Sequence, residues 1–464
     1  MWKSAQPCNL RLARGFDLCH FIFMKAFVGP GQHWHIAGVG GVGMNAIAQV
    51  TLHGGCRVTG SDRLRDQGKT TPVLDKLERL GLPLVPQDGL ALDARTTGLV
   101  ISSAIEDDNP EWVAAQRLNI PVWHRAAWLA RLVRDEHVIA VAGTAGKTTV
   151  TGMLGWLLHA EGLKPNVVNG GAVLNWRTEQ ALGNVRLTGS DWWVLEVDES
   201  DRSLLQFKPR WAVITNISHD HFPLPETVDL FRRFAMQVNE GIVAPFAVQE
   251  MLNGAGPRWV TVADSLPLAL PASLPGAHNQ ANARLALACC RALGLANGDE
   301  GAAGFDRFAG IERRLECVGR LNGAPVYDDY AHNPAKIAAA CQAVAPPRGR
   351  LFAVWRPHGF GPLSALAPDL VVECAQWMRP TDHFIVLPVY YSGGTPGPSE
   401  WTVERFVSAL QSAGVAARAV ADFEALTPYL QKEVQTVDTV LSMGARDPQL
   451  PLFARQLTNT VRIQ

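Results

Sequence analysis

Two stretches of this chain share one order: a strand, a glycine-rich turn and a helix. The first, HWHIAGVGGVGMNAIAQVTLHGG, occupies residues 33–55, and the second opens with HVIAVAGTAGKTT at residues 137–149. A glycine turn that leads from a strand into a helix is a natural phosphate-binding site, because its backbone N–H groups and the helix dipole favour an anion. Two such units predict an α/β protein with parallel sheets and two nucleotide-type sites.

The chain is long enough for about three domains, at roughly 150 residues each. A third region of alternating strands and helices begins near residue 311, with apolar strands at 350–358, 383–390 and 438–447. We therefore expect an N-terminal Rossmann-like domain, a central P-loop ATPase-type α/β domain and a C-terminal Rossmann-like α/β domain. The expected boundaries are 25–134, 135–311 and 312–464. Residues 1–24 are expected to be a disordered extension or a mis-assigned start, because no cleavage site of small residues follows their apolar run.

The composition excludes several classes of partner. Apolar residues make up 47% of the chain and charged residues 18%, as in soluble globular proteins. A net charge of −1 gives no field that would attract nucleic acid or an anionic membrane, and no apolar run reaches the ~18 residues of a membrane span. The eight cysteines lack the spacing of zinc ligands, so we expect reduced thiols in a cytoplasmic protein.

The second glycine loop has the residue types that bind nucleotide phosphates. Gly143 and Gly146 let a phosphate approach the backbone, Lys147 can reach the β- and γ-phosphates, and Thr148 can ligate Mg²⁺. The usual spacing would place a further glycine at position 141, where the chain has a valine that can end the preceding strand. A glycine turn with an incidental lysine is the alternative, but the position between strand and helix favours a phosphate site.

Polar residues follow two further strands of the central region. The sequence EVDESD at residues 196–201 begins with Glu196, and TNISHDHF at residues 215–222 contains His221. Because ligands bind at the carboxyl ends of parallel strands, Glu196 is a candidate magnesium ligand and His221 a candidate metal or phosphate ligand. The alternatives are a solvated acidic turn and a structural histidine.

The first glycine loop, Gly38-Val39-Gly40-Gly41-Val42-Gly43, has Gly-x-Gly-x-x-Gly spacing. Asp62 follows about 20 residues later, where dinucleotide-binding domains carry an acid that binds ribose. The pattern is weak by itself. It would suit an NAD-dependent oxidoreductase, but the ATP-type loop in the same chain argues against that class.

Together these motifs resemble those of the Mur ligase family, the ATP-dependent amide-forming enzymes of peptidoglycan synthesis. The resemblance covers residues 33 to 450 and rests on nine motifs in order: GVGGVGMNAIA, TGSD, SSAI, AGTAGKTTVT, LEVDESD, TNISHDH, HNQANA, RRLE and DDYAHNP. Within the family, GVGGVGM and EVDESD are most similar to the alanine-adding members.

The resemblance implies ATP and Mg²⁺ as cofactors and a two-step reaction. The carboxylate of UDP-N-acetylmuramate, or of a related UDP-sugar, would attack the γ-phosphate of ATP to give an acyl phosphate and ADP. The amino group of an amino acid, expected to be L-alanine, or of a short peptide would then displace phosphate and form an amide. The chain would act as a monomer or homodimer.

The resemblance also implies the site residues. Lys147, Glu196, His221 and His332 would be catalytic, and Thr148, Glu196 and His221 would hold the metal. The expected ATP-binding residues are Gly143, Thr144, Ala145, Gly146, Lys147, Thr148, Thr149, His278, Asn279, Asn282, Arg314 and Asp329. The expected UDP-sugar-binding residues are Gly40, Gly41, Val42, Gly43, Asp62 and Ser103.

Four positions depart from the alanine-adding pattern. Ala145 and Asn333 stand where those enzymes typically carry histidine, and Gly359 and Pro362 stand where they typically carry arginine. Since arginine is the usual residue for fixing a carboxylate, these changes predict an altered amino-acid or sugar-nucleotide pocket. Two alternatives follow: a ligase with altered substrate, such as one that recycles murein tripeptide, and a non-catalytic nucleotide-binding homologue.

Overall fold

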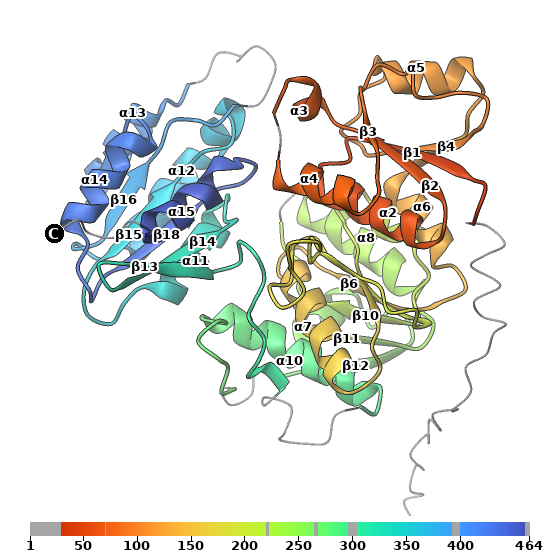
Figure 1. The fold of residues 1–464 in the computed structure, drawn as a ribbon. Helices are drawn as coiled ribbons and strands as arrows, with labels where there is room; N and C mark the ends of the chain where they lie inside the picture. The colour runs from red at the N-terminus through yellow and green to blue at the C-terminus, as the bar shows by residue number, and fades with distance from the viewer. Residues whose placement is uncertain are drawn as a thin grey trace, which may run out of the picture. The chain divides into compact units, whose positions relative to one another are not determined.

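The structure is a computed structural model that describes residues 29–69, 71–219, 222–263, 268–295, 304–391 and 400–459 (Figure 1). Its contacts divide the chain into two compact units, one of Met1–Pro267 with Asn282–Phe308 and one of Leu268–Ala281 with Ala309–Gln464. The first unit contains two β-sheets and the second contains one. The expected extension, residues 1–24, lies outside the described residues.

The first sheet has five parallel strands in the order β3-β2-β1-β4-β5. Its strands are β1 (His33–Ala37), β2 (Arg57–Ser61), β3 (Leu84–Val85), β4 (Thr96–Ile101) and β5 (Val122–His124), and its helices are α2 (Val42–His53), α3 (Arg63–Asp66), α4 (Pro72–Arg79), α5 (Pro110–Arg117) and α6 (Arg125–Leu132). Asp62, Thr71 and Asn109 cap the N-termini of α3, α4 and α5 by accepting backbone N–H groups. The strand order reverses between β1 and β4, which places the first glycine loop where such sheets form their ligand crevice.

The second sheet has seven strands in the order β12-β11-β10-β6-β9-β7-β8, and the edge strand β8 is antiparallel to β7. Its strands are β6 (His137–Ala142), β7 (Asn166–Val168), β8 (Val185–Arg186), β9 (Trp192–Glu196), β10 (Trp211–Ile214), β11 (Gly241–Pro245) and β12 (Arg258–Val262). The helical segments are α7 (Lys147–Ala160), η1 (Ser203–Gln206), α8 (Leu224–Ala235), α9 (Phe246–Met251) and α10 (Ala277–Ala292). The central strand β6 leads into the second glycine loop.

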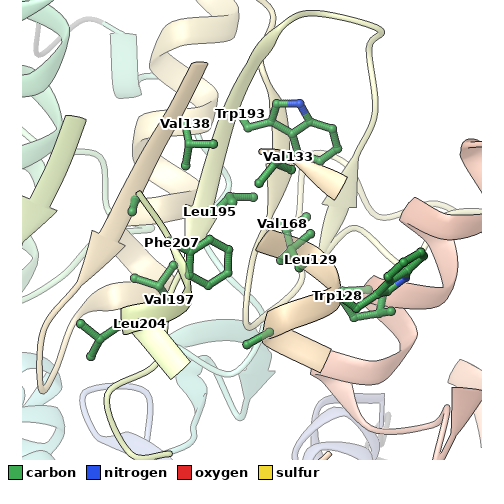
Figure 2. Close-up of a cluster of buried hydrophobic side chains, with 14 of the residues drawn as sticks. Trp128, Leu129, Val133, Val138, Val168, Trp193, Leu195, Val197, Leu204 and Phe207 are labelled. Atoms are coloured by element: carbon green, nitrogen blue, oxygen red, sulfur yellow. The ribbon is translucent and has the colours of Figure 1, made fainter. Parts of the chain in front are cut away.

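One buried hydrophobic cluster continues from the first sheet into the second (Figure 2). Trp34 of β1 stacks on Trp128 of α6 with ring centroids 3.8 Å apart. Leu129 of the same helix belongs to this cluster together with Trp193 and Leu195 of β9. Because this core is shared, the two glycine loops are carried by one packed body.

The third sheet forms the second unit, with the order β13-β14-β18-β15-β16-β17 and an antiparallel β13. Its strands are β13 (Glu316–Leu321), β14 (Ala324–Asp329), β15 (Leu351–Trp355), β16 (His383–Val386), β17 (Ala417–Ala419) and β18 (Thr439–Met443), and its helices are α11 (Pro334–Val344), α12 (Phe360–Trp377), α13 (Val403–Ser412), α14 (Phe423–Glu433) and α15 (Gln449–Asn459). Phe352 and Val354 pack into one apolar cluster, and Ala353 and Trp355 pack into another. This alternation shows that β15 is buried on both faces, as in parallel sheets covered by helices.

The predicted fold class is confirmed, since the chain forms three α/β regions built on mainly parallel sheets. The structure contains, in the ranges that it describes, no helix both long and apolar enough to cross a membrane.

Candidate active site

The loop between β6 and α7 accepts only glycine at two positions. Gly143 has φ +138°, and a Cβ atom there would lie 1.9 Å from Oγ1 of Thr215. Gly146 has φ +84°, and a Cβ atom there would lie 2.6 Å from Oδ1 of Asn282. The preceding strand extends through Ala142, so position 141 belongs to the strand and needs no glycine. The loop is therefore a short phosphate-type loop closely enclosed by its neighbours.

The end of β10 holds the middle of this loop in place. The backbone N–H of Ala145 donates to Oδ1 of Asn216 at 3.0 Å. The carbonyl oxygen of Ala145 accepts hydrogen bonds from Thr215 Oγ1 at 2.6 Å and Asn216 Nδ2 at 2.9 Å. Both backbone groups at position 145 are thus bound by neighbouring side chains. These hydrogen bonds fix the backbone of the loop, as expected of a preorganised anion site.

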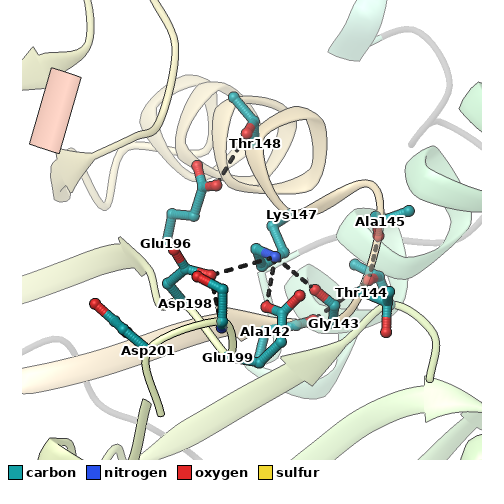
Figure 3. A network of polar contacts seen from close by, with 12 residues as sticks. Ala142, Gly143, Thr144, Ala145, Lys147, Thr148, Glu196, Asp198, Glu199 and Asp201 are labelled. Carbon is teal, nitrogen blue, oxygen red and sulfur yellow. Dashed lines mark hydrogen bonds and ion pairs between the residues drawn. The ribbon is translucent and has the colours of Figure 1, made fainter. Parts of the chain in front are cut away.

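Lys147 begins α7 and faces a group of carboxylates (Figure 3). Its Nζ donates to Glu199 Oε2 at 2.5 Å and to the carbonyl oxygen of Gly143 at 2.8 Å, and it lies 3.9 Å from Asp198 Oδ1. Burial alone would lower the pKa of Lys147, but the charges of Glu199, Asp198 and Glu196 outweigh burial and raise it. The lysine is therefore a firmly held cation beside the loop.

Glu196 ends β9 and contacts the first turn of α7. Its Oε1 accepts a hydrogen bond from Thr148 Oγ1 at 2.9 Å, and its Oε2 accepts the backbone N–H of Gly170 at 2.6 Å. Within the described part of the chain, Oε1 of the buried Glu199 has no hydrogen-bond partner. A hydroxyl and carboxylates at one strand end form an oxygen-donor set of the kind that Mg²⁺ prefers.

The predicted ligand His221 and its neighbour Asp220 lie outside the described residues. In the part of the chain that the structure describes, no three His, Cys, Asp or Glu side chains form a preformed metal site. Mg²⁺ usually keeps several waters and binds one or two carboxylates together with substrate phosphates. Thr148 and Glu196 therefore fit the predicted magnesium role without a complete protein cage.

The first glycine loop is held by Asp62. The backbone N–H of Gly40 donates to Asp62 Oδ2 at 2.9 Å, and the N–H of Leu64 donates to Oδ1 at 2.9 Å. Asp62 is buried, and both of its carboxylate oxygens bind backbone groups. Its contacts therefore fix the loop and the start of α3, in addition to the ribose role expected from its spacing.

A pocket of about 320 Å³ lies between the first glycine loop and the end of β9. Its lining includes Gly41, Val42 and Gly43 on one side and Glu196 and Asp198 on the other. Ligand pockets of this kind combine a mainly apolar wall with a few placed polar groups. The pocket thus brings together residues predicted for two different sites.

Arg125 supplies a cation to the same pocket. Its Nη2 lies 3.0 Å from Asp201 Oδ2 and 3.6 Å from Asp198 Oδ2.

The predicted sugar-site residue Ser103 is exposed, and the preceding Ser102 lines the pocket. The sequence prediction missed Arg125, since it stands in no glycine loop or acidic motif, and it left out Glu199 although that residue lies in the recognised EVDESD motif.

Five of the predicted residues belong to the second unit, namely His278, Asn279, Arg314, Asp329 and His332. Buried Asp329 accepts the backbone N–H groups of Leu315 at 2.7 Å and Ala331 at 2.7 Å. Burial lowers the pKa of His278 against the opposing charge of Asp329. The guanidinium of Arg314 lies over the ring of Tyr330 at 5.5 Å.

His332 and His358 form a ring pair in the second unit. Their ring centroids are 5.4 Å apart in an edge-to-face arrangement, and His332 Nδ1 lies 2.9 Å from the carbonyl oxygen of Tyr330.

Of the predicted ATP residues, Asn282 is grouped with the loop in the first unit and lies against Gly146. Thr144 and Thr149 are buried within the loop and the first turn of α7.

A lysine-bearing glycine loop, with carboxylates at the next strand end, defines an α/β protein of the nucleotide-binding P-loop type. Three family models match the chain in order: "Mur ligase family, catalytic domain" at residues 33–137, "Mur ligase middle domain" at 141–229 and "Mur ligase, glutamate ligase domain" at 313–446. The UDP-N-acetylmuramate–L-alanine ligases of Sinorhizobium medicae and Rhizobium meliloti are each 34% identical to it, over 89% of this chain and 93% of theirs.

Solved structures show the same fold. A UDP-N-acetylmuramate–alanine ligase from Thermotoga maritima aligns with a TM-score of 0.75 at 24% identity, over 92% of this chain and 98% of the other. A murein peptide ligase from Psychrobacter arcticus aligns with a TM-score of 0.65 at 21% identity, over 93% of this chain and all of the other. The chain belongs to the Mur ligase family.

Proposed function

We propose that this protein is an ADP-forming ligase that joins the carboxylate of UDP-N-acetylmuramate to an amino acid, with L-alanine as the expected amine. The product would be a peptidoglycan precursor made in the cytoplasm. The curated relatives that carry this name match over nearly the whole chain, which supports the substrate pair. We propose residues 25–134 for binding the UDP-sugar, 135–311 for ATP and 312–464 for the amino acid.

One observation carries the proposal: a single pocket is lined by the first glycine loop and by the acids next to Lys147. A sugar-nucleotide on the first loop would place its carboxylate near the phosphates of ATP on the second loop. That carboxylate would attack the γ-phosphate and release ADP. The amine would then form a C–N bond at the acyl carbon, lose a proton and release phosphate.

The residues of the second loop would act mainly by charge and position. Lys147 would exchange its contact with Glu199 for the β- and γ-phosphates, while Thr148 and Glu196, with His221, would hold Mg²⁺. When bound, the metal would neutralise phosphate charge during transfer. Preorganised cations and N–H groups in an enclosed site usually supply the largest part of the rate acceleration in such reactions.

The test is phosphate release by the purified protein with ATP, MgCl₂, UDP-N-acetylmuramate and a panel of amines. L-Alanine should give stoichiometric ADP, phosphate and a product whose mass equals that of the two substrates less one water. Turnover with L-Ala-D-Glu-diaminopimelate and not with free amino acids would support the recycling alternative. No phosphate release with any amine would reject both ligase proposals and favour the non-catalytic alternative.

A further inference from the structure

Arg446 has an unusual backbone conformation at the end of a central strand in the second unit. It follows β18 by three residues and has φ +66°, in the left-handed region that glycine adopts freely and other residues adopt at a cost. A strained residue at the end of a sheet strand points to a function that its side chain supplies. Its side chain is exposed.

The position of Arg446 places it at the edge where an open α/β sheet binds its ligands. Strand β18 lies between β14 and β15 and is parallel to both, so the carboxyl ends of all three meet at one edge. His332 follows β14 and His358 follows β15 at this edge. Burial lowers the pKa of His358, and the positive charge of Arg446 lowers it further.

Two other arginines near this edge are already paired with carboxylates. Arg356 Nη1 lies 2.7 Å from Asp447 Oδ2, and Arg313 Nε lies 3.1 Å from Asp328 Oδ2. Arg446, in contrast, has no ion pair or hydrogen bond to its side chain from any residue in the described ranges. It is therefore a cation at the crevice edge that no carboxylate of the described residues binds.

The loop after β15 cannot supply such a cation. Residues 357–362 read PHGFGP and contain no arginine or lysine. Gly359 has φ +152°, and a Cβ atom there would lie 3.1 Å from the ring of Pro362, so a larger side chain would be strained at this position. On the neighbouring strand end, by contrast, Arg446 is an exposed cation.

We propose that Arg446 binds the carboxylate of the incoming amino acid and so selects amino acids over amines without a carboxylate. The proposal rests on the proposed ligase function and specifies its amine site. Arginine suits this role because its planar guanidinium can donate two parallel hydrogen bonds to a carboxylate. His332 and His358 would form the wall beside the bound amino acid.

Arg446→Gly is an informative variant because it removes the guanidinium while it relieves the backbone strain. Phosphate release is measured against the concentration of L-alanine and of L-alaninamide, at saturating ATP and UDP-N-acetylmuramate. The variant should raise the KM for L-alanine by roughly tenfold to a hundredfold, the scale of a lost charge-assisted hydrogen bond, and should abolish the preference for L-alanine over its amide. The KM for ATP should not change, and the melting temperature should be equal or higher.

Lys164→Gly is the matched control, since Lys164 is also an exposed cation with a positive φ of +48°. It should leave both KM values for the amines unchanged. Arg446→Lys should keep part of the preference for L-alanine over L-alaninamide. Lysine keeps the positive charge but lacks the planar guanidinium that can donate two parallel hydrogen bonds. An unchanged KM and an unchanged preference in Arg446→Gly would overturn the proposal.

A binding measurement tests the carboxylate site even if the protein turns over no substrate, and so separates the two proposals. The imidazole NMR signals of His358, assigned with a His358→Gln variant, are followed during titration with L-alanine and L-alaninamide. A shift with L-alanine that is lost in Arg446→Gly would support the carboxylate site even if the ligase proposal failed. No shift with L-alanine in the unmodified protein, under conditions without turnover, would overturn the carboxylate-site proposal, while the ligase proposal is decided separately by phosphate release.

Discussion

The two glycine loops of the first unit begin alike and differ in the charges that face them. Each follows a buried central strand and leads into a helix, β1 to α2 and β6 to α7. In the first loop, the carboxylate of Asp62 accepts a hydrogen bond from the backbone of the loop itself. The second loop carries Lys147, which meets Glu199 and Asp198 from the end of β9. The two loops thus share a backbone pattern and differ in the charged side chains that lie beside them.

We expect the largest losses of activity and stability when the positive charge of the second loop is removed. Lys147→Ala should lower phosphate release by about a thousandfold, because it removes the cation that would neutralise the phosphates. It should also lower the free energy of unfolding by about 3–5 kcal/mol, since the buried Glu199 would lose its partner. Turnover and thermal unfolding are measured on the same protein.

A double variant separates the two effects of Lys147. Lys147→Ala combined with Glu199→Gln should regain most of the lost stability, because no buried charge is then left unpaired. It should not regain turnover. If Lys147→Ala alone released phosphate within tenfold of the unmodified protein, the phosphate role of this lysine would be wrong.

The two loops should also differ in how much stability they lose when alanine replaces a glycine. Gly143→Ala should lower the free energy of unfolding by about 2–5 kcal/mol, through its positive φ and its clash with Thr215. In the first loop, Gly41→Ala should cost less than about 1 kcal/mol, since Gly41 has an ordinary φ of −65° and the nearest atom to an added Cβ would be 3.4 Å away. Denaturant unfolding checks both variants.

The clash at Gly143 can be tested by removing the other partner. Gly143→Ala combined with Thr215→Ala should recover part of the lost stability, because the side-chain contact disappears and the backbone strain remains. Equal stability of the Gly143→Ala and Gly41→Ala variants would show that the two loops are not differently enclosed.

A substitution at Gly40 tests the first loop alone. In Gly40→Ala, the new Cβ would lie 2.7 Å from Asp62 Oδ2, so the carboxylate must move away from the loop. The KM for UDP-N-acetylmuramate should rise about tenfold, while the KM for ATP stays unchanged, as a loss of about one hydrogen bond implies. In an Asp62→Ala background the same substitution should have little further effect. A rise in the KM for ATP would contradict the separation of the two loops.

Much of this arrangement could be predicted from local sequence. Glycines bounded by an apolar strand and a helix determine both loops, because their backbone conformations depend on adjacent residues. The positions of Lys147 and Thr148 follow from local sequence for the same reason, since both residues stand at the start of the helix that follows the second loop. The sheets also follow from the regular alternation of strands and helices.

The partners of these residues depend on tertiary structure and could not be predicted in the same way. EVDESD offers four acids in six residues, and the sequence does not show that Glu199 is the one that contacts Lys147. Arg125 reaches Asp201 across 76 positions, a contact that requires the packing of α6 against the second sheet. Ser102 lines the pocket in place of Ser103, since successive side chains after a strand point in different directions.

The smallest effect is expected from the carboxylate that holds the first loop. In Asp62→Asn, one oxygen can still accept the N–H of Leu64 and cap α3, but the amide NH₂ cannot accept the N–H of Gly40. The variant should therefore lose about 1 kcal/mol of stability and raise the KM for UDP-N-acetylmuramate about threefold. Thermal unfolding and phosphate release measure the two effects. An increase in KM far above that of Gly40→Ala would mean that Asp62 also contacts the substrate, as ribose-binding acids do, and would give the first loop a charged ligand contact like that of the second.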